Sequence, residues 1–356
     1  MRLLMLGGTE FVGRAVTEAA LERDWQVTVF HRGHHAPPPG VRVLTGDRTG
    51  GERGLVALAG HAGDWDLVVD TWSGVPTAVR DSARLLAGRA GHYSYVSSRS
   101  VYACPAPAGL DEGGPLVAGA SPDEDGRDGD VPYDRAKRGG ELAALDAFGD
   151  RALLARAGLI IGPGENIGRL PWWLSRIARG GPVIAPGPRT TELQYVDARD
   201  LASWLLDAAV AGLHGAYNTV SRPGHTTIGE LLDACVRVTG SDAELRWTDP
   251  DTLLAAGVEP WTGMPIWLPE RELYDTLFRG GHTKAEAAGL RCRPAAVTVA
   301  DTWAWLCERG GTAPRRPDRP AVGLDPQLEE KLLALRPSCG STPSYRETHR
   351  GKSGVS

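Results

Sequence analysis

Two residues of the segment PYDRAKRGG have the types and spacing of a proton-transfer pair. Tyr133 and Lys137 lie four residues apart, so on a helix both side chains fall on one face. A phenol with an ordinary pKa of about 10 is a poor acid or base at neutral pH, and a nearby ammonium moves it toward the working range. The pattern predicts that Tyr133 is a general acid/base, tuned by Lys137, which also holds a ribose hydroxyl. The alternative is an accidental pair on an exposed helix.

A glycine-rich turn, GGTEFVG, follows the first apolar run of the chain. Residues 2–6 are typical of a buried parallel strand, and apolar residues recur at helical spacing from Val12 onward. Gly7 suits the tight turn and Gly13 suits close packing of helix on strand. The turn therefore predicts a dinucleotide pyrophosphate at the helix N-terminus. The residues expected to contact that cofactor are Gly7, Thr9, Glu10, Phe11, Val12 and Gly13.

Glu10 stands where the middle glycine of such a turn is usual. Its carboxylate would lie near the pyrophosphate, so it must point away or pair with a cation such as Arg14 or Arg32. The sequence leaves these alternatives open.

The turn, the segment YVSSRSVYA and the Tyr-x-x-x-Lys pair together resemble the extended and atypical branches of the short-chain dehydrogenase/reductase family, from Met1 to about Val220. The Gly-Gly-Thr-x-Phe-x-Gly form resembles that of atypical, epimerase/dehydratase-like members, which accounts for Glu10. The resemblance implies that Ser98, four residues before Tyr102, is the catalytic hydroxyl that holds the reacting oxygen, in preference to Ser97. Sugar-nucleotide dehydratases carry an acidic pair where this chain has Arg99 and Ser100, which argues against a 4,6-dehydratase mechanism.

The second strand-like run ends without an acidic residue for a ribose 2′-hydroxyl and offers Arg32, which favours NADP over NAD, with NAD as the alternative. The three histidines nearby, at 31, 34 and 35, have no carboxylate or cysteine partners in the pattern, so we expect no metal. The resemblance implies further cofactor contacts: Asp47 at the adenine, and Asp70, Thr71 and Trp72 at the nicotinamide ribose, each with a turn or strand cap as its alternative. It also implies a contact at Gly158 beside the nicotinamide, where Ala157 replaces the family's proline.

The elements that must position these residues form a βα alternation. Strand-like runs at 26–30, 41–44, 66–70, 92–97 and 151–157 are separated mostly by helical stretches. This pattern predicts an α/β fold: a Rossmann-type doubly wound parallel sheet with a smaller mixed C-terminal substrate lobe. Ligands of such sheets bind at the carboxyl ends of the strands.

The expected boundaries follow a change in composition after residue 160, where proline, glycine and tryptophan increase. We expect a dinucleotide-binding domain over 1–165, to which 190–220 returns. The substrate lobe then comprises 166–189 and 221–336. Residues 337–356 read as a disordered tail, and the acidic segment 121–130 as a solvated loop. Possible substrate contacts in the second part, with buried packing as the alternative, are Trp172, Trp173, Arg176, Gln194 and Trp267.

The composition argues against two classes of protein, those that bind nucleic acid and those that span a membrane. The formal net charge is −5 and the pI is about 6.0, which argues against a nucleic-acid surface. Five scattered cysteines without a C-x-x-C pair indicate a reducing, cytoplasmic compartment, and no stretch is long and apolar enough for a membrane span. We expect a small-molecule substrate, no nucleic-acid or membrane partner, and a homodimer as the assembly to test.

The resulting prediction is an NAD(P)-dependent oxidoreductase that moves hydride between NADP(H) and a carbonyl or carbinol of a small polar substrate. The first alternative is an epimerase that acts through a transient ketone, on a substrate such as a sugar nucleotide. The second is a non-catalytic member that binds a cofactor or RNA.

Overall fold

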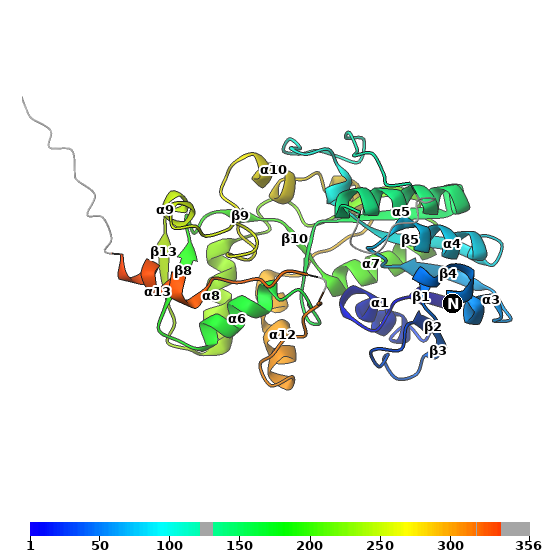
Figure 1. Ribbon diagram of the computed structural model, residues 1–356, viewed down its shortest axis with the longest axis horizontal. Coiled ribbons are helices and arrows are strands. Elements are labelled where there is room, and N and C mark those ends of the chain that lie inside the picture. The colour runs from blue at the N-terminus through cyan, green and yellow to red at the C-terminus, as the bar shows by residue number, and fades with distance from the viewer. Residues whose placement is uncertain (122–130, 318, 336–356) are drawn as a thin grey trace, which may run out of the picture.

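The computed structural model describes residues 1–121, 131–317 and 319–335. Figure 1 shows two lobes side by side, a sheet-centred one built mainly from the first half of the chain and a smaller one built mainly from the second. The expected tail and most of the expected acidic loop lie outside the described residues.

The first lobe is built on a seven-stranded sheet in the order β11-β6-β5-β4-β1-β2-β3, with every pairing parallel. This is the doubly wound Rossmann-type architecture predicted from the βα alternation. The strands that make up the sheet are β1 (Arg2–Leu6), β2 (Gln26–His31), β3 (Arg42–Thr45), β4 (Trp65–Asp70), β5 (Ala90–Ser98), β6 (Ala152–Ala157) and β11 (Gly215–Thr219).

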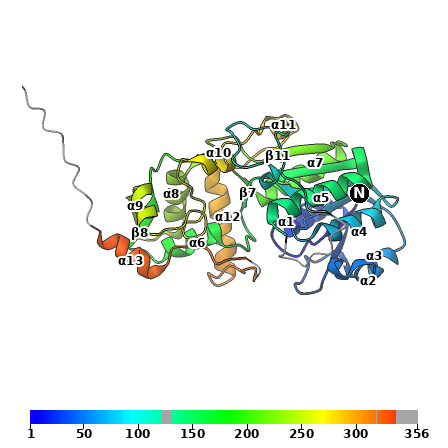
Figure 2. The same cartoon turned by 45° about the horizontal axis from the view of Figure 1, so that its top comes forward.

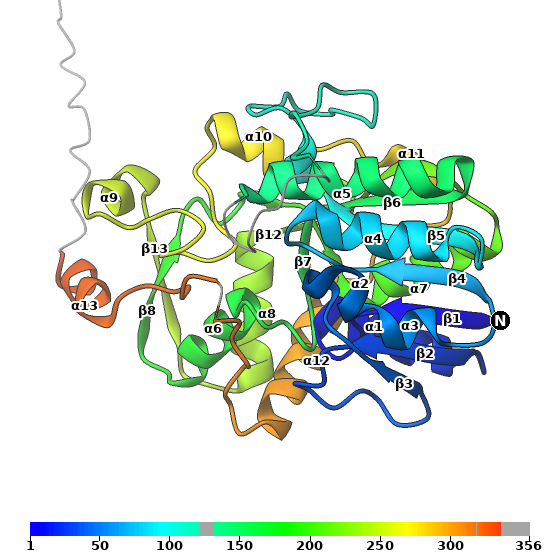
Figure 3. The same cartoon turned by 45° about the vertical axis from the view of Figure 1, so that its right-hand side comes forward.

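Helices cover both faces of this sheet, because its strands are apolar on both sides. One face packs against α1 (Phe11–Leu21) and α7 (Ala198–Val210). The other packs against α4 (Pro76–Leu86) and α5 (Tyr133–Phe148), which lie side by side in Figure 3. The remaining short helices of this lobe are η1 (Arg48–Gly50), α2 (Gly51–Gly54), α3 (Val56–Ala59), η2 (Arg99–Val101) and η3 (Gly149–Arg151).

The strand order reverses between β1 and β4, since the chain runs outward from β1 through β2 to β3 and then returns. In open α/β sheets the space beyond the carboxyl ends of the strands at such a reversal is where ligands bind. The glycine turn follows β1 at this point, and Thr71 follows β4. Their side-by-side placement is direct, since the Thr71 hydroxyl donates to the Leu6 carbonyl at 3.3 Å.

The second lobe has its own apolar core, built around Trp173, Trp267 and the helices α6 (Arg169–Ala178), α8 (Ile228–Thr239) and α12 (Ala295–Glu308). Figure 2 shows α12 on the side of this lobe that faces the first. Its other helices are α9 (Pro250–Ala255), α10 (Glu272–Phe278) and α13 (Pro326–Ala334). The short strands are β8 (Pro182–Pro186) with β13 (Glu244–Thr248), β7 (Leu159–Ile161) with β10 (Tyr195–Asp197), and β9 (Glu192–Leu193) with β12 (Thr226–Thr227).

One part of the expected division is wrong. The helix α11 (Thr283–Ala287) and the residues after it pack on the first lobe, although 221–336 was assigned to the second. Ala285 and Leu290 are buried in the same core as α7, and the Trp204 indole N–H donates to the Ala288 carbonyl at 3.0 Å. The chain therefore crosses back to the first lobe once more than composition indicated. No helix of the described ranges is long and apolar enough to cross a membrane.

Candidate active site

The glycine turn has the backbone that its sequence predicts. Gly7 and Gly8 have φ values of +110° and +89°, in the region that favours glycine. A Cβ on Gly13 would lie 2.6 Å from the Gly8 nitrogen, so only glycine lets α1 approach the turn this closely. The turn thus leaves the N-terminal N–H groups of α1 close to the carboxyl end of β1, which fits an anionic pyrophosphate.

Glu10 takes neither of the partners that the sequence suggested. It is the N-cap residue of α1 but its side chain caps no N–H group, and its Oε1 lies 3.7 Å from the His35 Nε2. Arg14 instead pairs with Glu18 at 2.7 Å. Arg32 has no hydrogen-bond or ion-pair partner within the described ranges. Glu10 therefore does not capture the guanidinium expected at the 2′-position of the ribose.

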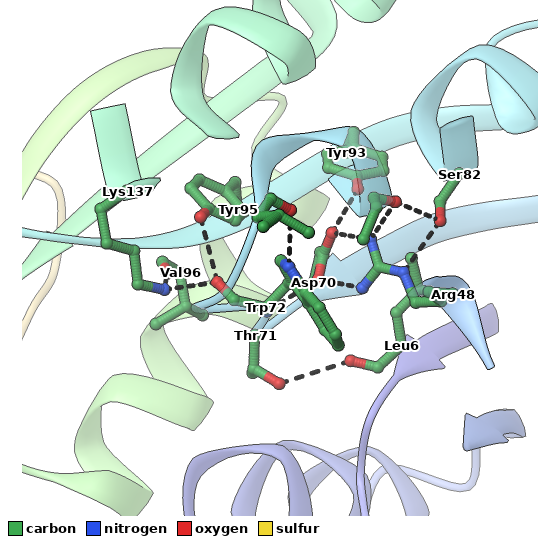
Figure 4. A network of polar contacts seen from close by, with 12 residues as sticks. Leu6, Arg48, Asp70, Thr71, Trp72, Ser82, Tyr93, Tyr95, Val96 and Lys137 are labelled. Carbon is green, nitrogen blue, oxygen red and sulfur yellow. Dashed lines mark hydrogen bonds and ion pairs between the residues drawn. The ribbon is translucent and has the colours of Figure 1, made fainter. Parts of the chain in front are cut away.

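Lys137 is held at the carboxyl ends of β4 and β5 (Figure 4). Its Nζ donates to the Trp72 carbonyl at 2.6 Å and to the Val96 carbonyl at 2.7 Å, and it lies 4.9 Å from the centre of the Tyr95 ring. The side chain is only 3% exposed. Burial, reinforced by two arginines of a C-terminal segment, lowers the pKa of Lys137 to about 7, so a small change in its surroundings alters its charge near neutral pH.

The Trp72 carbonyl is itself fixed by a buried ion pair. Asp70 accepts from both terminal nitrogens of Arg48, at 2.7 and 2.6 Å, from the Tyr93 hydroxyl at 2.6 Å and from the Trp72 N–H at 2.9 Å. Burial opposes ionisation of this carboxyl, but Arg48 and these hydrogen bonds outweigh it and hold the pKa of Asp70 below its ordinary value. The Asp70 carboxylate, expected at the nicotinamide ribose, is therefore used inside the protein, and it positions the loop that holds Lys137.

The two neighbouring serines at the end of β5 have different surroundings. The Ser97 hydroxyl is buried and donates to Glu141 at 2.7 Å, and Glu141 also binds Arg156 and Arg138. The Ser98 hydroxyl accepts from the Ser100 hydroxyl at 2.9 Å and is partly exposed. Of the two, only Ser98 keeps a hydroxyl outside the buried network, which suits it to meet a ligand.

Tyr133 is the first residue of α5, one turn before Lys137, and it remains 39% exposed. The helix fits closely onto β5 because Gly140 lies against the Tyr95 hydroxyl, where a Cβ would overlap it. The guanidinium of Arg319 lies over the Tyr133 ring, 5.0 Å from its centre. Tyr133 and Lys137 therefore come from one helix face, as their spacing predicted.

Two other residues expected to contact the cofactor, Asp47 and Gly158, lie just after strands of the sheet. Asp47 is exposed and caps η1, accepting from the Thr49 N–H at 3.0 Å. Gly158 separates β6 from β7, and a Cβ there would lie 2.6 Å from a Val220 methyl group.

The residues expected to contact substrate from the second lobe pack within the protein. Arg176 donates to Glu329 at 2.7 Å and to the Pro182 carbonyl at 2.6 Å, so its guanidinium is used within that lobe. Trp267 is 1% exposed and belongs to the core. Gln194 is completely buried and bonded to Gly280 through both ends of its amide. Trp172 is partly buried against the core.

Two groups near the site were missed by the sequence prediction. One is Arg99, 4% exposed, whose Nη1 reaches Gln194 at 3.3 Å and whose pKa is lowered to about 10 by burial. The other is the pair Arg316 and Arg319 in the segment PRRPDRP. The run of arginines between prolines is unusual and could have drawn attention to this segment. Its position beside Tyr133 could not be predicted from the sequence, because it depends on how the two lobes pack.

Comparison with known proteins gives the family. Residues 3–219 match the NAD dependent epimerase/dehydratase family. The chain belongs to that family. Its members are enzymes, and the matched residues include the glycine turn, Ser98, Tyr133 and Lys137. No curated protein matches the sequence.

Solved structures of low sequence identity share the fold. The Bordetella bronchiseptica enzyme WbmH, in complex with NAD+, is 17% identical with a TM-score of 0.60, over 87% of this chain and 99% of that one. A UDP-glucose 4-epimerase from Thermotoga maritima, with UDP-glucose, is 17% identical with a TM-score of 0.57, over 87% and 99%. A UDP-glucose 4-epimerase from Thermus thermophilus, in complex with NAD, is 20% identical with a TM-score of 0.56, over 85% and 99%.

Proposed function

We propose that this family member is an NAD(P)-dependent oxidoreductase in which Tyr133 is the general acid/base. The observation that carries the proposal is the anchoring of Lys137 by two carbonyls, one helical turn from Tyr133, at the carboxyl ends of the strands beside the glycine turn. The Gly7–Gly13 turn fits a dinucleotide, because its positive φ angles and the close approach at Gly13 leave backbone N–H groups for a pyrophosphate. The bound cofactor would accept or supply hydride.

The remaining roles belong to the side chains of this chain. Tyr133 gives a proton to, or takes one from, the oxygen of the substrate, while Ser98 donates a hydrogen bond to that oxygen. Lys137 orients the cofactor ribose and adds positive charge near the phenol. Because its Nζ is already held by two carbonyls, it is placed for this role before any ligand binds.

Reduction of a ketone and epimerisation through a transient ketone use the same side chains. Epimerisation is the second candidate, favoured by the family match. The two differ in whether the cofactor leaves in a changed redox state, so net consumption of reduced cofactor distinguishes them.

The preferred cofactor in this proposal is NADP. Arg32 follows β2, at the strand end where the ribose 2′-group of a dinucleotide lies in such folds, and Glu10 does not pair with it. We expect Arg32→Ala to weaken NADPH binding by about 1.5–3 kcal/mol, the range for a hydrogen bond to a charged group, and to leave NADH binding nearly unchanged. Calorimetric titration of both cofactors measures this. Arg14→Ala, which removes a cation paired with Glu18, is the matched control. Equal affinity of the wild type for NADH and NADPH contradicts the NADP preference.

The acid/base role is tested by Tyr133→Phe. We expect turnover to fall by a factor on the order of 10² or more, with cofactor affinity nearly intact, because only the transferable proton is lost. Tyr217→Phe, which removes a phenol on β11, is the control and should change turnover little. A Tyr133→Phe variant with near-normal turnover removes Tyr133 from the mechanism.

A further inference from the structure

Arg99 is a buried cation that has no carboxylate partner. It is 4% exposed, and its one hydrogen bond within the described residues runs from Nη1 to the Gln194 Oε1 at 3.3 Å. A buried charge normally needs a counter-charge, because burial removes its hydration. Three other arginines are buried in the part of the chain that the structure describes, and each has such a partner: Arg48 with Asp70, Arg156 with Glu141 and Arg176 with Glu329.

The unused donors of Arg99 lie along one edge of its guanidinium. Nε and Nη2 donate to no group of the described residues, and Nε has no contact with solvent. The N–H bonds of these two nitrogens are parallel, which is the fork that binds both oxygens of a carboxylate. Arg156 shows this arrangement in the same lobe, since its Nε and Nη2 donate to the two oxygens of Glu141 at 2.9 and 3.1 Å. The corresponding edge of Arg99 has no such carboxylate.

Arg99 lies at the carboxyl edge of the sheet, directly after Ser98. It is the first residue of η2, which follows β5. Its partner Gln194 donates through Nε2 to the Ser221 carbonyl at 2.8 Å, just beyond the end of β11. The order of the strands places β6 and β11 on one side of β5, and β4 and β1 with the glycine turn on the other. A substrate whose oxygen meets Ser98, and which extends away from the dinucleotide, therefore reaches toward Arg99.

The backbone at Gly280 fits closely against the guanidinium. A Cβ on Gly280 would lie 1.9 Å from the Arg99 Cζ, so only glycine leaves room for this side chain. The Gly280 N–H donates to the same Gln194 oxygen at 2.9 Å, and its carbonyl accepts from the Gln194 Nε2 at 2.9 Å. The neutral amide of Gln194 thus positions both the guanidinium and the backbone beside it, but it adds no negative charge.

Two titratable groups, Tyr102 and Glu112, act on the charge of Arg99 without contacting it as a counter-ion. Burial raises the pKa of Tyr102, so its phenol is neutral at neutral pH. Glu112 is partly exposed and beyond ion-pair distance of Arg99, and its Oε1 accepts from the Asn218 N–H at 2.7 Å. The charge of Arg99 is therefore not matched by a carboxylate of the described residues in contact with it.

We propose that Arg99 binds a carboxylate of the substrate, so that the compound on which Tyr133 and Ser98 act is a hydroxy or oxo acid. The inference rests on the proposed function, because Ser98 marks the position of the reacting oxygen. A carboxylate has one negative charge and two oxygens, which match the uncompensated charge and the two donors of the unused edge. Because Nε is closed to solvent, the carboxylate reaches it only when the packing around the guanidinium opens.

A phosphate group fits this position less well. It carries a charge of about −1.5 to −2 at pH 7, more than one guanidinium neutralises. The excess negative charge would lie in the neighbourhood of Glu112. The proposal therefore names a carboxylate, and a phosphate becomes an outcome of the test.

The first test is calorimetric titration of the protein saturated with NADP+, or with NAD+ if only that dinucleotide binds. The probes are D-glucuronate, its uncharged counterpart D-glucose and, as the phosphate, D-glucose 6-phosphate. We expect glucuronate to bind at least about tenfold more tightly than the other two, the scale of a hydrogen bond to a charged group. The inference is overturned if glucuronate binds no better than glucose, or if the phosphate binds most tightly.

Variants then assign the preference to Arg99. Arg99→Met should weaken glucuronate about tenfold or more and leave glucose unchanged. Arg99→Lys, which keeps the charge but lacks the fork, should recover part of the loss. The matched control is Arg279→Met, which removes a partly exposed cation next to Gly280 and should change glucuronate affinity less than about twofold. Equal losses in Arg99→Met and Arg279→Met would show a general effect of positive charge and contradict the assignment.

Urea unfolding distinguishes a binding role from a structural one. Arg99→Met removes a buried charge without a counter-charge, so the urea midpoint should stay the same or rise. Arg156→Met is the comparison, because it leaves Glu141 buried without its paired donors and should lower the midpoint. If Arg99→Met lowers the midpoint as much as Arg156→Met, Arg99 serves the fold and the inference is overturned.

The same titration separates this inference from the proposed function. Tyr133→Phe should bind glucuronate as the wild type does, even though its turnover is lost. If glucuronate is preferred through Arg99 but Tyr133→Phe keeps normal turnover, the acid/base role alone is wrong. If Tyr133→Phe loses turnover but glucuronate is not preferred over glucose, the role of Arg99 alone is wrong.

Discussion

The two lobes use their charged side chains differently. In the first lobe, a buried ion pair lies directly beneath the site, since Asp70 binds Arg48 and also fixes the loop whose carbonyl holds Lys137. In the second lobe, the pair of Arg176 and Glu329 joins α6 to α13 and the edge of β8, away from the helix α5 in Figure 1. Burial of an ion pair therefore says little by itself about function. The two pairs differ in what their carboxylates also bind. Asp70 accepts from the Trp72 N–H, and the Trp72 carbonyl holds Lys137, whereas Glu329 accepts from the Ile184 N–H of β8.

The largest effect is expected from Asp70→Asn. It leaves the Arg48 guanidinium buried without its counter-charge, which costs about 3–5 kcal/mol in the free energy of unfolding. It also loosens the Trp72 loop, so cofactor affinity should fall in protein that remains folded. Asp66→Asn is the matched control on the same strand, because its pair with Arg2 is exposed to solvent and contributes little to the free energy of unfolding. Urea unfolding compares them, and equal losses for the two variants would contradict the account.

A smaller loss of stability is expected from Arg176→Met in the second lobe. It leaves Glu329 largely buried, and because the pair is partly reached by solvent we expect about 2–3 kcal/mol. Cofactor affinity should not change, in contrast to Asp70→Asn. Urea unfolding and NADPH titration measure the two quantities. Lost NADPH binding in a folded Arg176→Met variant would show that the second-lobe pair also supports the site.

The smallest effect concerns pH and Lys137. Its pKa in the folded protein is lowered to about 7 from the ordinary 10.5, so above pH 7 the unfolded chain holds a proton that the folded chain has lost. Stability of the wild type relative to Lys137→Met should therefore rise by about 1.5 kcal/mol between pH 7 and pH 8.5, and should not change below pH 6. Unfolding curves at several pH values test this. A difference that falls as the pH rises would contradict the assigned direction.

Most elements that could be predicted from the sequence lie in the first lobe, because short apolar strands alternate there with helices. Each short apolar run there became a strand with bounds within two residues of those expected, and the glycine turn has the positive φ angles that its residues imply. Tyr133 and Lys137 could be placed on one face because helical spacing is a local property.

The contacts of the second lobe could not be predicted from the sequence, because they join residues that are far apart in the chain. The partner of Arg176 is 153 residues later in the chain, and no local pattern announces it. The segment PRRPDRP likewise has a distinctive composition, but the contact of Arg319 with the Tyr133 ring joins residues that are far apart in the sequence. The return of α11 to the first lobe was missed for the same reason.

The most direct test of the central claim is hydride transfer itself. The protein is incubated with a metabolite extract and NADPH carrying deuterium at the transferable position of the nicotinamide, and products are analysed by mass spectrometry. The account predicts a carbinol that gains deuterium with the wild type and with Tyr217→Phe, and gains it at least about a hundredfold more slowly with Tyr133→Phe. In the epimerase alternative, cofactor bound during turnover keeps its redox state overall. Deuterium transfer at the same rate in wild type and Tyr133→Phe would contradict the role of the Tyr133–Lys137 pair.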